Sequence, residues 1–454
     1  MLWCKLEDVN LNSEPEKQGS MKSLLRNKLL GSGMISLLIK VSGAGLSYLM
    51  FVAFAHLLNA QDYGVFAFSF NLAVVVSAFA GFGYSTAIMR YWPKYLAQNK
   101  PEYATGAIMM GTQLTLLGIT LALLMGYMAD HFWIGGSERN YFVVAILAST
   151  FCIGDFAAGI LRAQNSVVAS MLPRDVLWRI LAPLFALVAV WSGYALNSSA
   201  AVYICAIVLL ALLILQVIVI QTNLKQNAVQ LPTVSDWAGT RKSLIPLWGA
   251  GIIFAMIQQM DVVVVGFLGN AAETGAYFAA QKTAALLSLV LITGGLVTAP
   301  IMATLYEKKQ TQELQNICRQ MVVAIAFVTL LGFLFLVFAG NILLSIFNPS
   351  FTSAYFILLI LAFGSMIDAV SGPTAYLMQM TSLESVYARM LAVVYVFVFV
   401  LQLLFIPKYG VIAAALSNAT GVIVWNCVSI YFLRKTIGID PSLFGIFFPI
   451  KVRT

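Results

Sequence analysis

The chain has 454 residues, of which 61% are hydrophobic and only 10% are charged. A soluble globular chain carries about 25% charged residues, so this composition excludes a soluble domain and indicates an integral membrane protein. The formal net charge of +8 comes mainly from the loops on one side of the membrane, and we do not interpret it as nucleic-acid binding.

Apolar stretches that are long enough to cross a bilayer recur along nearly the whole chain. A helix needs about 20 residues to cross a hydrocarbon core of about 30 Å. Runs such as VYICAIVLLALLILQVIVI (202–220) lack the alternation that a membrane β-barrel strand requires. We therefore predict an all-α integral membrane protein with about twelve transmembrane helices, near residues 31–57, 63–89, 103–128, 141–161, 176–195, 199–222, 244–268, 275–304, 320–340, 353–377, 388–406 and 411–433.

Basic residues are distributed unequally between the loops on the two sides of these helices. If the N-terminus is cytoplasmic, 21 of the 26 Lys and Arg residues fall in inner segments and three fall inside spans. Only Arg139 and Lys408 fall in outer loops. Cytoplasmic loops of membrane proteins carry an excess of Lys and Arg, so this distribution predicts that both termini are cytoplasmic.

One short pattern occurs twice, at a spacing of 211 residues. NAQDYGVFAFSFN (59–71) matches NAAETGAYFAAQK (270–282), so that Asn59 aligns with Asn270 and Gly64 aligns with Gly275. Each copy forms the outer turn between the first two helices of a predicted six-helix set. Because six is an even number, the two sets enter and leave on the same side, as parallel repeats do.

These patterns predict two parallel-related six-helix lobes around a central cavity, which is the plan of a transporter. The predicted parts are a cytoplasmic N-terminal segment (1–30), an N-lobe (31–222), a cytoplasmic linker (223–243), a C-lobe (244–433) and a cytoplasmic tail (434–454).

The sequence contains no pattern that indicates a cofactor, a metal or nucleotide hydrolysis. The five cysteines are scattered, without a CxxC pair, and no GxxxxGK[ST] motif is present. We therefore expect no cofactor and no metal, and energy that comes from an ion gradient, from substrate supply or from a partner. A polysaccharide polymerase or ligase is disfavoured, because every predicted outer loop has only about a dozen residues or fewer. The chain is therefore not expected to be an enzyme.

Four segments carry a family resemblance that covers roughly residues 30–435. They are AHLLNAQDYGVFAFSFNLA, GFGYSTAIMRYWPKY, MDVVVVGFLGNAAETGAYFAAQKTAALLSL and IPKYGVIAAALSNATG. Together they resemble the polysaccharide transporter branch of the multidrug/oligosaccharidyl-lipid/polysaccharide exporter superfamily, which includes the O-antigen and capsule flippases.

The resemblance implies a flippase in the inner membrane of a bacterium. Such a protein moves an undecaprenyl-diphosphate-linked oligosaccharide of an O-antigen, capsule or exopolysaccharide across the membrane by alternating access. Its partners would be the lipid-linked oligosaccharide, membrane lipid and a polysaccharide polymerase or chain-length protein, with no nucleic acid. The alternative is a cation-coupled multidrug exporter of the same superfamily, which would need an anionic cavity.

Ionisable residues inside the predicted spans are the candidate site residues, because such groups are expensive in a bilayer and mark functional sites. In the N-lobe, Lys40 lies about 14 Å past the inner start of its helix. It is expected either to bind a diphosphate or acidic sugar or to snorkel to the interface. The same two roles are open for Arg179, which the predicted boundaries place a few residues into its helix. Arg90 is an interfacial residue or a contact for lipid phosphate. Asp155 is a candidate for carrying a coupling proton, and for pairing with Lys40 or Arg162.

In the C-lobe, Asp261 and Lys282 lie at similar depths on consecutive helices and are expected to meet. Their pair is either structural or a gate that opens when substrate phosphate or a proton competes for it. Gln258 lies one turn before Asp261 and is a candidate sugar contact. Asp368 is a second candidate for a coupling proton, and Pro373 is predicted to lie inside the span 353–377.

Overall fold

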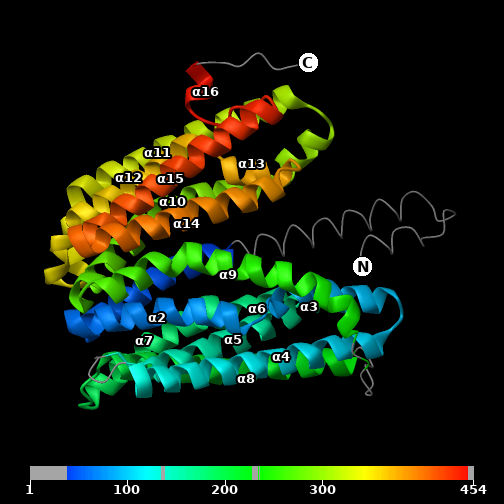
Figure 1. Ribbon diagram of the computed structural model, residues 1–454, viewed down its shortest axis with the longest axis vertical. Helices are drawn as coiled ribbons and strands as arrows, with labels where there is room; N and C mark the ends of the chain where they lie inside the picture. The colour runs from blue at the N-terminus through cyan, green and yellow to red at the C-terminus, as the bar shows by residue number, and fades with distance from the viewer. Residues whose placement is uncertain (1–37, 134–138, 227–233, 235, 448–454) are drawn as a thin grey trace. The chain divides into compact units, whose positions relative to one another are not determined.

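The computed structural model describes residues 38–133, 139–226, 234 and 236–447. Regular structure in these residues is helical, and no strand occurs among them (Figure 1). Eleven of the described helices are long and apolar enough to cross a membrane. The predicted segment 1–30, residues 227–233 and 235 of the linker, and the last seven residues of the tail lie outside the described residues.

The helices overlap the predicted spans, with differences at several of their ends. The first described helix is Leu38–Leu57. It is followed by α2 (Ala60–Ala80), α3 (Tyr84–Ala97), α4 (Pro101–Met128), η2 (Ala129–Trp133), α5 (Tyr141–Ala163), α6 (Val167–Leu172), η3 (Pro173–Leu177), α7 (Trp178–Trp191) and α8 (Ser198–Gln226). The second half of the chain contains α9 (Trp237–Leu268), α10 (Ala271–Glu307), α11 (Thr311–Phe347), η4 (Pro349–Ala354), α12 (Tyr355–Ser371), α13 (Thr374–Met380), α14 (Glu384–Tyr409), α15 (Val411–Thr436) and α16 (Phe444–Phe447).

The described residues form two compact units. The N-terminal unit contains the residues up to Met50 and Leu72–Ala255, and the C-terminal unit contains Phe51–Asn71 and the residues from Met256 onward. The turn between the first two helices, residues Phe51–Asn71, therefore packs with the second half of the chain. The predicted boundaries of the two lobes remain a prediction.

In the N-terminal unit, α5 is the central helix and packs against α3, α4 and α8. Aromatic residues of α3 fill much of the core between these helices, with Tyr84, Tyr91, Trp92 and Tyr95 all buried. The predicted span 63–89 is not one helix, because the chain turns between α2 and α3. Gly83 has a φ of 68°, and a Cβ on it would lie 2.6 Å from the backbone nitrogen of Trp248. Only glycine fits such a conformation at such close approach.

The predicted span 176–195 differs from the structure at its start. The helix begins at Val167 and continues without interruption through α6, η3 and α7 to Trp191. The segment η3 is a π-helix, which is a local widening that is frequent at functional sites. Because α7 alone has 14 residues, it is too short to cross a bilayer without the turns that precede it.

In the C-terminal unit, α12 packs against α10, α11 and α15, and α15 also packs against α14. Figure 1 shows α10, α11, α12 and α15 running side by side. The prediction that Pro373 lies inside a span is wrong, because α12 ends at Ser371 and Pro373 directly precedes α13. Gly372 between them has a φ of 79° and abuts the carbonyl oxygen of Pro441, so the helix cannot continue there.

The start of the tail is anchored to the C-terminal unit. Asp440 is buried and forms an ion pair with Arg434 of α15. Its backbone nitrogen donates to Gln315 of α11 at 2.9 Å, and the Gln315 amide donates back to the Asp440 carbonyl at 2.6 Å. The segment after α15 therefore connects the ends of two membrane-spanning helices.

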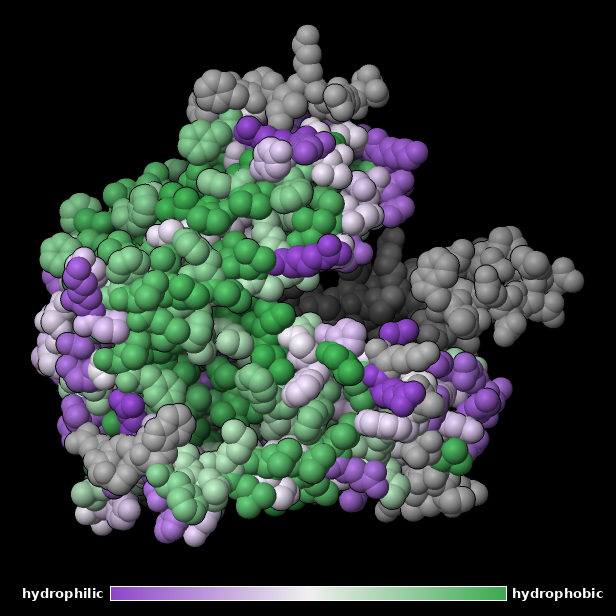
Figure 2. Space-filling model, viewed as in Figure 1, coloured by the Kyte–Doolittle hydropathy of each residue, from purple (hydrophilic) through white to green (hydrophobic). Residues whose placement is uncertain are grey.

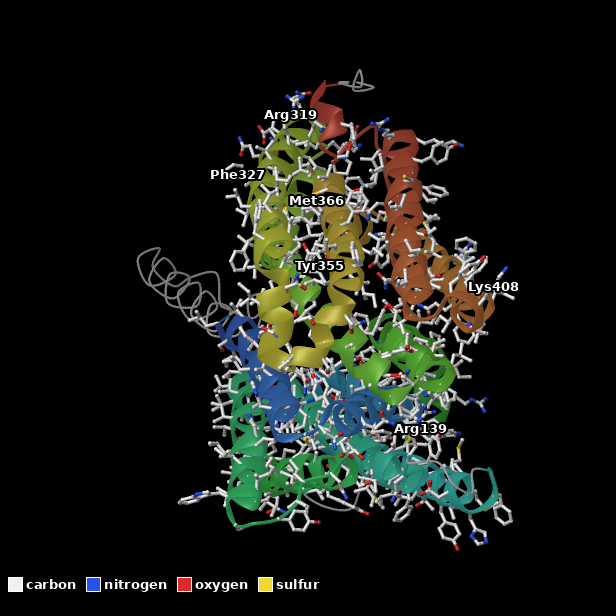
Figure 3. All side chains as sticks on the ribbon, turned by 90° about the vertical axis from the view of Figure 1, so that its left-hand side faces the viewer. Arg139, Arg319, Phe327, Tyr355, Met366 and Lys408 are labelled. Carbon is white, nitrogen blue, oxygen red and sulfur yellow. The ribbon has the colours of Figure 1, made fainter. Side chains whose placement is uncertain are left out.

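Side-chain polarity agrees with a membrane-spanning protein. Figure 2 shows hydrophobic residues along the middle of the helices on the visible face, with hydrophilic residues gathered toward the helix ends. In the C-terminal unit, Figure 3 shows Arg319 and Lys408 toward opposite ends of the spanning helices. The positive-inside rule predicts that the Arg319 end is cytoplasmic.

Candidate functional site

The N-terminal unit holds a cluster of charged side chains within its spanning helices. Arg174 of η3 forms an ion pair with Asp155 of α5, and the guanidinium carbon of Arg174 lies 5.2 Å from the centre of the Phe151 ring. The side chains of Arg174 and Asp155 are 29% and 43% exposed. Asp155 thus pairs with Arg174, and not with Lys40 or Arg162, the two partners considered from the sequence. The Arg162 side chain donates to the Ala158 carbonyl of its own helix.

Arg179 lies deeper than the predicted helix boundary suggested. It follows the observed helix start at Val167 by twelve residues, which corresponds to about 18 Å along the axis. Its guanidinium donates to the carbonyl of Gly43 in the first helix and lies 3.4 Å from the Asp175 carboxylate. The Gly43 position admits this contact because it has no side chain: a Cβ there would lie 2.9 Å from the guanidinium.

The other two cationic candidates of this unit are exposed. Lys40 lies three residues before Gly43, so it shares a helix face with the carbonyl that Arg179 contacts. Arg90 is exposed on α3, between buried aromatic residues. The N-terminal cluster therefore combines Arg174 and Arg179 with two carboxylates, and Lys40 adds a cation on the adjoining face.

Asp261 is the most enclosed of the candidate residues. It lies on α9, it is 6% exposed, and three uncharged groups donate to its carboxylate. The Gln402 amide of α14 donates at 2.7 Å, the Asn418 amide of α15 donates to the other oxygen, and the Tyr277 hydroxyl of α10 lies 3.5 Å away. A buried carboxylate that is held only by uncharged donors has its polar contacts satisfied but its charge uncompensated. Such a site is suited to taking up a proton or a cation.

Asp368 has a similar environment on α12. The Asn426 amide of α15 donates to its carboxylate at 2.8 Å, and the Thr374 hydroxyl donates to the Asn426 carbonyl oxygen at 3.1 Å. Asn418 and Asn426 are eight residues apart on α15, which places them on the same side of the helix about 12 Å apart. One helix therefore presents an amide to each of the two carboxylates.

The structure places Lys282 against aromatic rings. Its ammonium lies 4.9 Å from the ring centre of Phe278 and 5.6 Å from that of Phe51, which is cation–π geometry. Since the donors to Asp261 are uncharged, the structure does not bring Asp261 and Lys282 together as an ion pair. Gln258, three residues before Asp261, is exposed.

The repeated turn has the same local structure in both copies. The Asn59 side chain accepts from the backbone nitrogen of Asp62 at 2.8 Å, and the Asn270 side chain accepts from that of Glu273 at 2.8 Å. Each asparagine thereby satisfies a backbone donor at the start of a helix. Asp62 and Glu273 lie in the first turn of α2 and α10, where an acidic side chain interacts favourably with the helix dipole.

Several site residues are absent from the sequence prediction. Arg174 lies just before the predicted span 176–195, and Pro173 before it has the features of a helix start, because proline is frequent at the first helical position. Gln402, Asn418 and Asn426 carry no charge, so the search for ionisable groups in spans did not select them. An amide inside an apolar run such as VFVFVLQLLFIP is the signal that identifies them.

The described residues contain no group of three or more His, Cys, Asp or Glu side chains that is arranged to hold a metal ion. Any cation bound at Asp261 or Asp368 would be held by one carboxylate with neutral oxygen donors.

The fold and these charged groups define a multi-pass, all-α membrane protein with polar sites inside its spanning segments. Residues 29–306 match the model of a family described as polysaccharide biosynthesis protein. Because this match covers more than half of the sequence, the chain belongs to that family.

Two known proteins are similar in sequence to this chain over most of its length. A membrane protein of Methanocaldococcus jannaschii, described as uncharacterized, is 24% identical over 86% of this chain and 81% of its own length. A probable low-salt glycan biosynthesis flippase of Haloferax volcanii is 24% identical over 88% of this chain and 82% of its own length.

Two solved structures share the fold. An inward-facing multidrug resistance transporter of the MATE family has a TM-score of 0.70 at 12% identity, over 88% of this chain and 98% of its own. The lipid II flippase MurJ, in an inward closed conformation, has a TM-score of 0.66 at 13% identity, over 88% and 87% of the two chains. Both similarities show that this chain shares the fold of these two proteins.

Proposed function

We propose that the protein is a flippase that moves a lipid-linked oligosaccharide, carried on undecaprenyl diphosphate, from the cytoplasmic to the outer leaflet of a bacterial inner membrane. The observation that carries the proposal is the family match, together with the relative described as a glycan biosynthesis flippase. The sugar belongs to an O-antigen, a capsule or an exopolysaccharide. Both termini lie in the cytoplasm, and a polymerase or chain-length protein receives the product.

The cationic residues of the N-terminal unit are the proposed contacts for the diphosphate. Arg174 and Arg179 lie within a spanning segment, and each keeps more than a fifth of its side chain exposed. Arginine binds phosphate oxygens in a two-pronged geometry. A diphosphate would compete with Asp155 for Arg174, while Lys40 and Arg90 attract it from the exposed face. Lys282 and Gln258 are proposed contacts for the head group in the C-terminal unit.

Asp261 and Asp368 are the proposed coupling sites. Each carboxylate is held by neutral amides, so binding a proton or cation removes an uncompensated charge from the membrane interior. The charge state of Asp261 changes how strongly it holds Gln402 and Asn418. A gradient would therefore bias the packing of α14 and α15 against α9.

The second candidate function is a cation-coupled exporter of small molecules. The two carboxylates of the C-terminal unit favour it, because a cationic drug needs an anionic site. In this reading Asp261 and Asp368 bind the drug itself as well as the coupling ion.

A strain that lacks the gene separates the two functions. We expect undecaprenyl-diphosphate oligosaccharide to accumulate in its inner membrane, to be relieved by the wild-type gene, and to persist with Arg174→Ala or Lys40→Ala at equal protein level. Lys309→Ala is the matched control, because this exposed lysine lies outside the spans. If the carrier lipid does not accumulate while drug sensitivity rises, the flippase proposal is overturned in favour of the exporter.

A further inference from the structure

A groove lies between α14 and α15 in the C-terminal unit. It has a volume of about 520 Å³, and its walls are formed by Leu401, Phe405 and Tyr409 of α14 and by Ile412, Leu416 and Thr420 of α15. These residues flank the turn at Gly410, which the charge distribution assigns to the outer side. The groove extends about eight residues along each helix, or about 12 Å.

The groove opens on the exposed surface of the helix pair. Tyr409 is 58% exposed and Leu416 is 52% exposed, whereas Gln402 and Ile406 of α14 point into the core and are 1% and 3% exposed. In a membrane, hydrocarbon chains fill such a groove. Lipid chains are as apolar as the groove walls, so the walls alone do not select one lipid over another.

Lys408 supplies a polar contact that can distinguish one lipid from another. Its ammonium lies 5.2 Å from the ring centre of Tyr409, and the Tyr409 ring lies 6.0 Å from that of Phe405. A cation therefore stands at the outer mouth of the apolar groove, and Figure 3 shows Lys408 projecting from the end of its helix. By the predicted topology it is one of only two basic residues in the outer loops. A cation above an apolar channel complements a phosphate attached to a long hydrocarbon chain.

The groove and the Asp261 site involve neighbouring residues of the same helix pair. Leu401 lines the groove, and the next residue, Gln402, donates to Asp261. On α15, Ser417 lines the groove and the next residue, Asn418, donates to the other oxygen of Asp261. A chain that occupies the groove therefore contacts the two helices whose amides hold the candidate coupling carboxylate.

We propose that this groove binds the polyprenyl chain of the carrier lipid on the outer side, with its phosphate at Lys408. The inference rests on the proposed function, since it concerns how the same substrate leaves. After the head group has crossed, the chain lies between α14 and α15 while the phosphate is held by Lys408. Release of the lipid then frees α14 and α15 to repack around Asp261.

Photo-crosslinking tests this assignment in the full-length protein. A benzophenone amino acid replaces Leu416 in the groove or, as the control, Phe338 on α11, which is 82% exposed. The protein is reconstituted in phosphatidylglycerol vesicles that contain a trace of labelled undecaprenyl diphosphate. We expect crosslinking to the label at Leu416 well above that at Phe338. Lys408→Gln should lower it about fivefold, since a basic residue near a membrane surface contributes about 1 kcal/mol. Lys408→Arg should retain it.

The outcomes distinguish this inference from the proposed function. Equal labelling at both positions, or no effect of Lys408→Gln, would mean that the groove holds only bulk lipid and would overturn the assignment. Translocation by the wild-type protein is measured in parallel vesicles. If it proceeds while the groove shows no selectivity, the proposed function stands and the groove assignment falls. If the wild-type protein moves no glycolipid, both fall.

Discussion

Gly275 packs directly on Gly64, the residue that aligns with it in the repeated turn. A Cβ on Gly275 would lie 3.2 Å from the Gly64 Cα, and a Cβ on Gly64 would lie 1.6 Å from the carbonyl oxygen of Ala271. The two copies of the pattern therefore meet backbone to backbone within the C-terminal unit. We interpret the repeat as a pair of helix starts that pack against each other within the C-terminal unit.

Gly64→Ala should prevent this close approach. The added methyl group collides with backbone atoms that cannot rotate away, and overpacking of this kind costs about 1–3 kcal/mol. We expect a cysteine at Ala272, in a cysteine-free background, to react faster with a membrane-impermeant thiol reagent when Gly64→Ala is present. Gly45→Ala is the control, because a Cβ at Gly45 meets no atom within 4 Å. Unchanged reactivity with Gly64→Ala would mean that this contact does not protect the start of α10.

The Asp155–Arg174 pair should be more important for transport than for stability. Both side chains are partly exposed, and such pairs contribute about 0–1 kcal/mol. We predict that Arg174→Asp and Asp155→Arg each abolish complementation, and that the double variant restores part of it, with a melting temperature close to that of the wild type. If the double variant is as inactive as the single ones, the pair itself is not what transport requires.

Asp261→Asn should remove coupling while the fold is kept. The asparagine side chain has one oxygen, which can accept from only one of the two amides of Gln402 and Asn418. Its NH2 group would face the other amide, so we expect a loss of about 1–3 kcal/mol in stability. Translocation in vesicles should no longer respond to an imposed proton or sodium gradient. Glu307→Gln, a change at an exposed carboxylate, is the control and should respond like the wild type. A gradient response that survives Asp261→Asn would exclude this residue as a coupling site.

Tyr95 gives a prediction for alkaline pH. Burial, together with a hydrogen bond of 3.1 Å from its hydroxyl to Asp236, raises the pKa of Tyr95 above its ordinary value. As pH rises, the Tyr95 hydroxyl therefore loses its proton first in the unfolded chain, near pH 10. The contribution of Tyr95 to the free energy of unfolding is fully present below that pH and is lost as pH rises further. Melting curves should show a smaller alkaline loss for Tyr95→Phe than for the wild type. The exposed Tyr194→Phe should behave like the wild type, and an equal loss in all three proteins would contradict this assignment.

The spanning helices were predictable because the bilayer imposes their length and composition. The turn at Asn59 and Asn270 was also predictable, since a capping side chain and an acidic residue in the first turn leave a local signal. The breaks at Gly83 and Gly372 were not, because each depends on a backbone segment that is distant in the sequence, at Trp248 and Pro441.

The candidate site was predicted only in part. A charged residue in an apolar run is visible in the sequence, so Asp261 and Asp155 were found. Their partners were not, because Gln402 is 141 residues from Asp261 along the chain and is brought to it by helix packing alone. The depth of Arg179 was misjudged for a different reason: Pro173 has the features of a helix start, yet the helix passes through it.

The most direct test of the proposed function is translocation by the purified, full-length protein in sealed vesicles. A labelled undecaprenyl-diphosphate oligosaccharide is placed in both leaflets, and the fraction that a membrane-impermeant glycosidase can reach is measured over time. We predict that the protected pool becomes accessible with the wild-type protein and with Gly45→Ala, and remains protected with Arg174→Ala. If the wild-type pool remains as protected as in protein-free vesicles, while a cationic dye is moved across the same membranes in response to an ion gradient, the protein is an exporter and the flippase account is wrong.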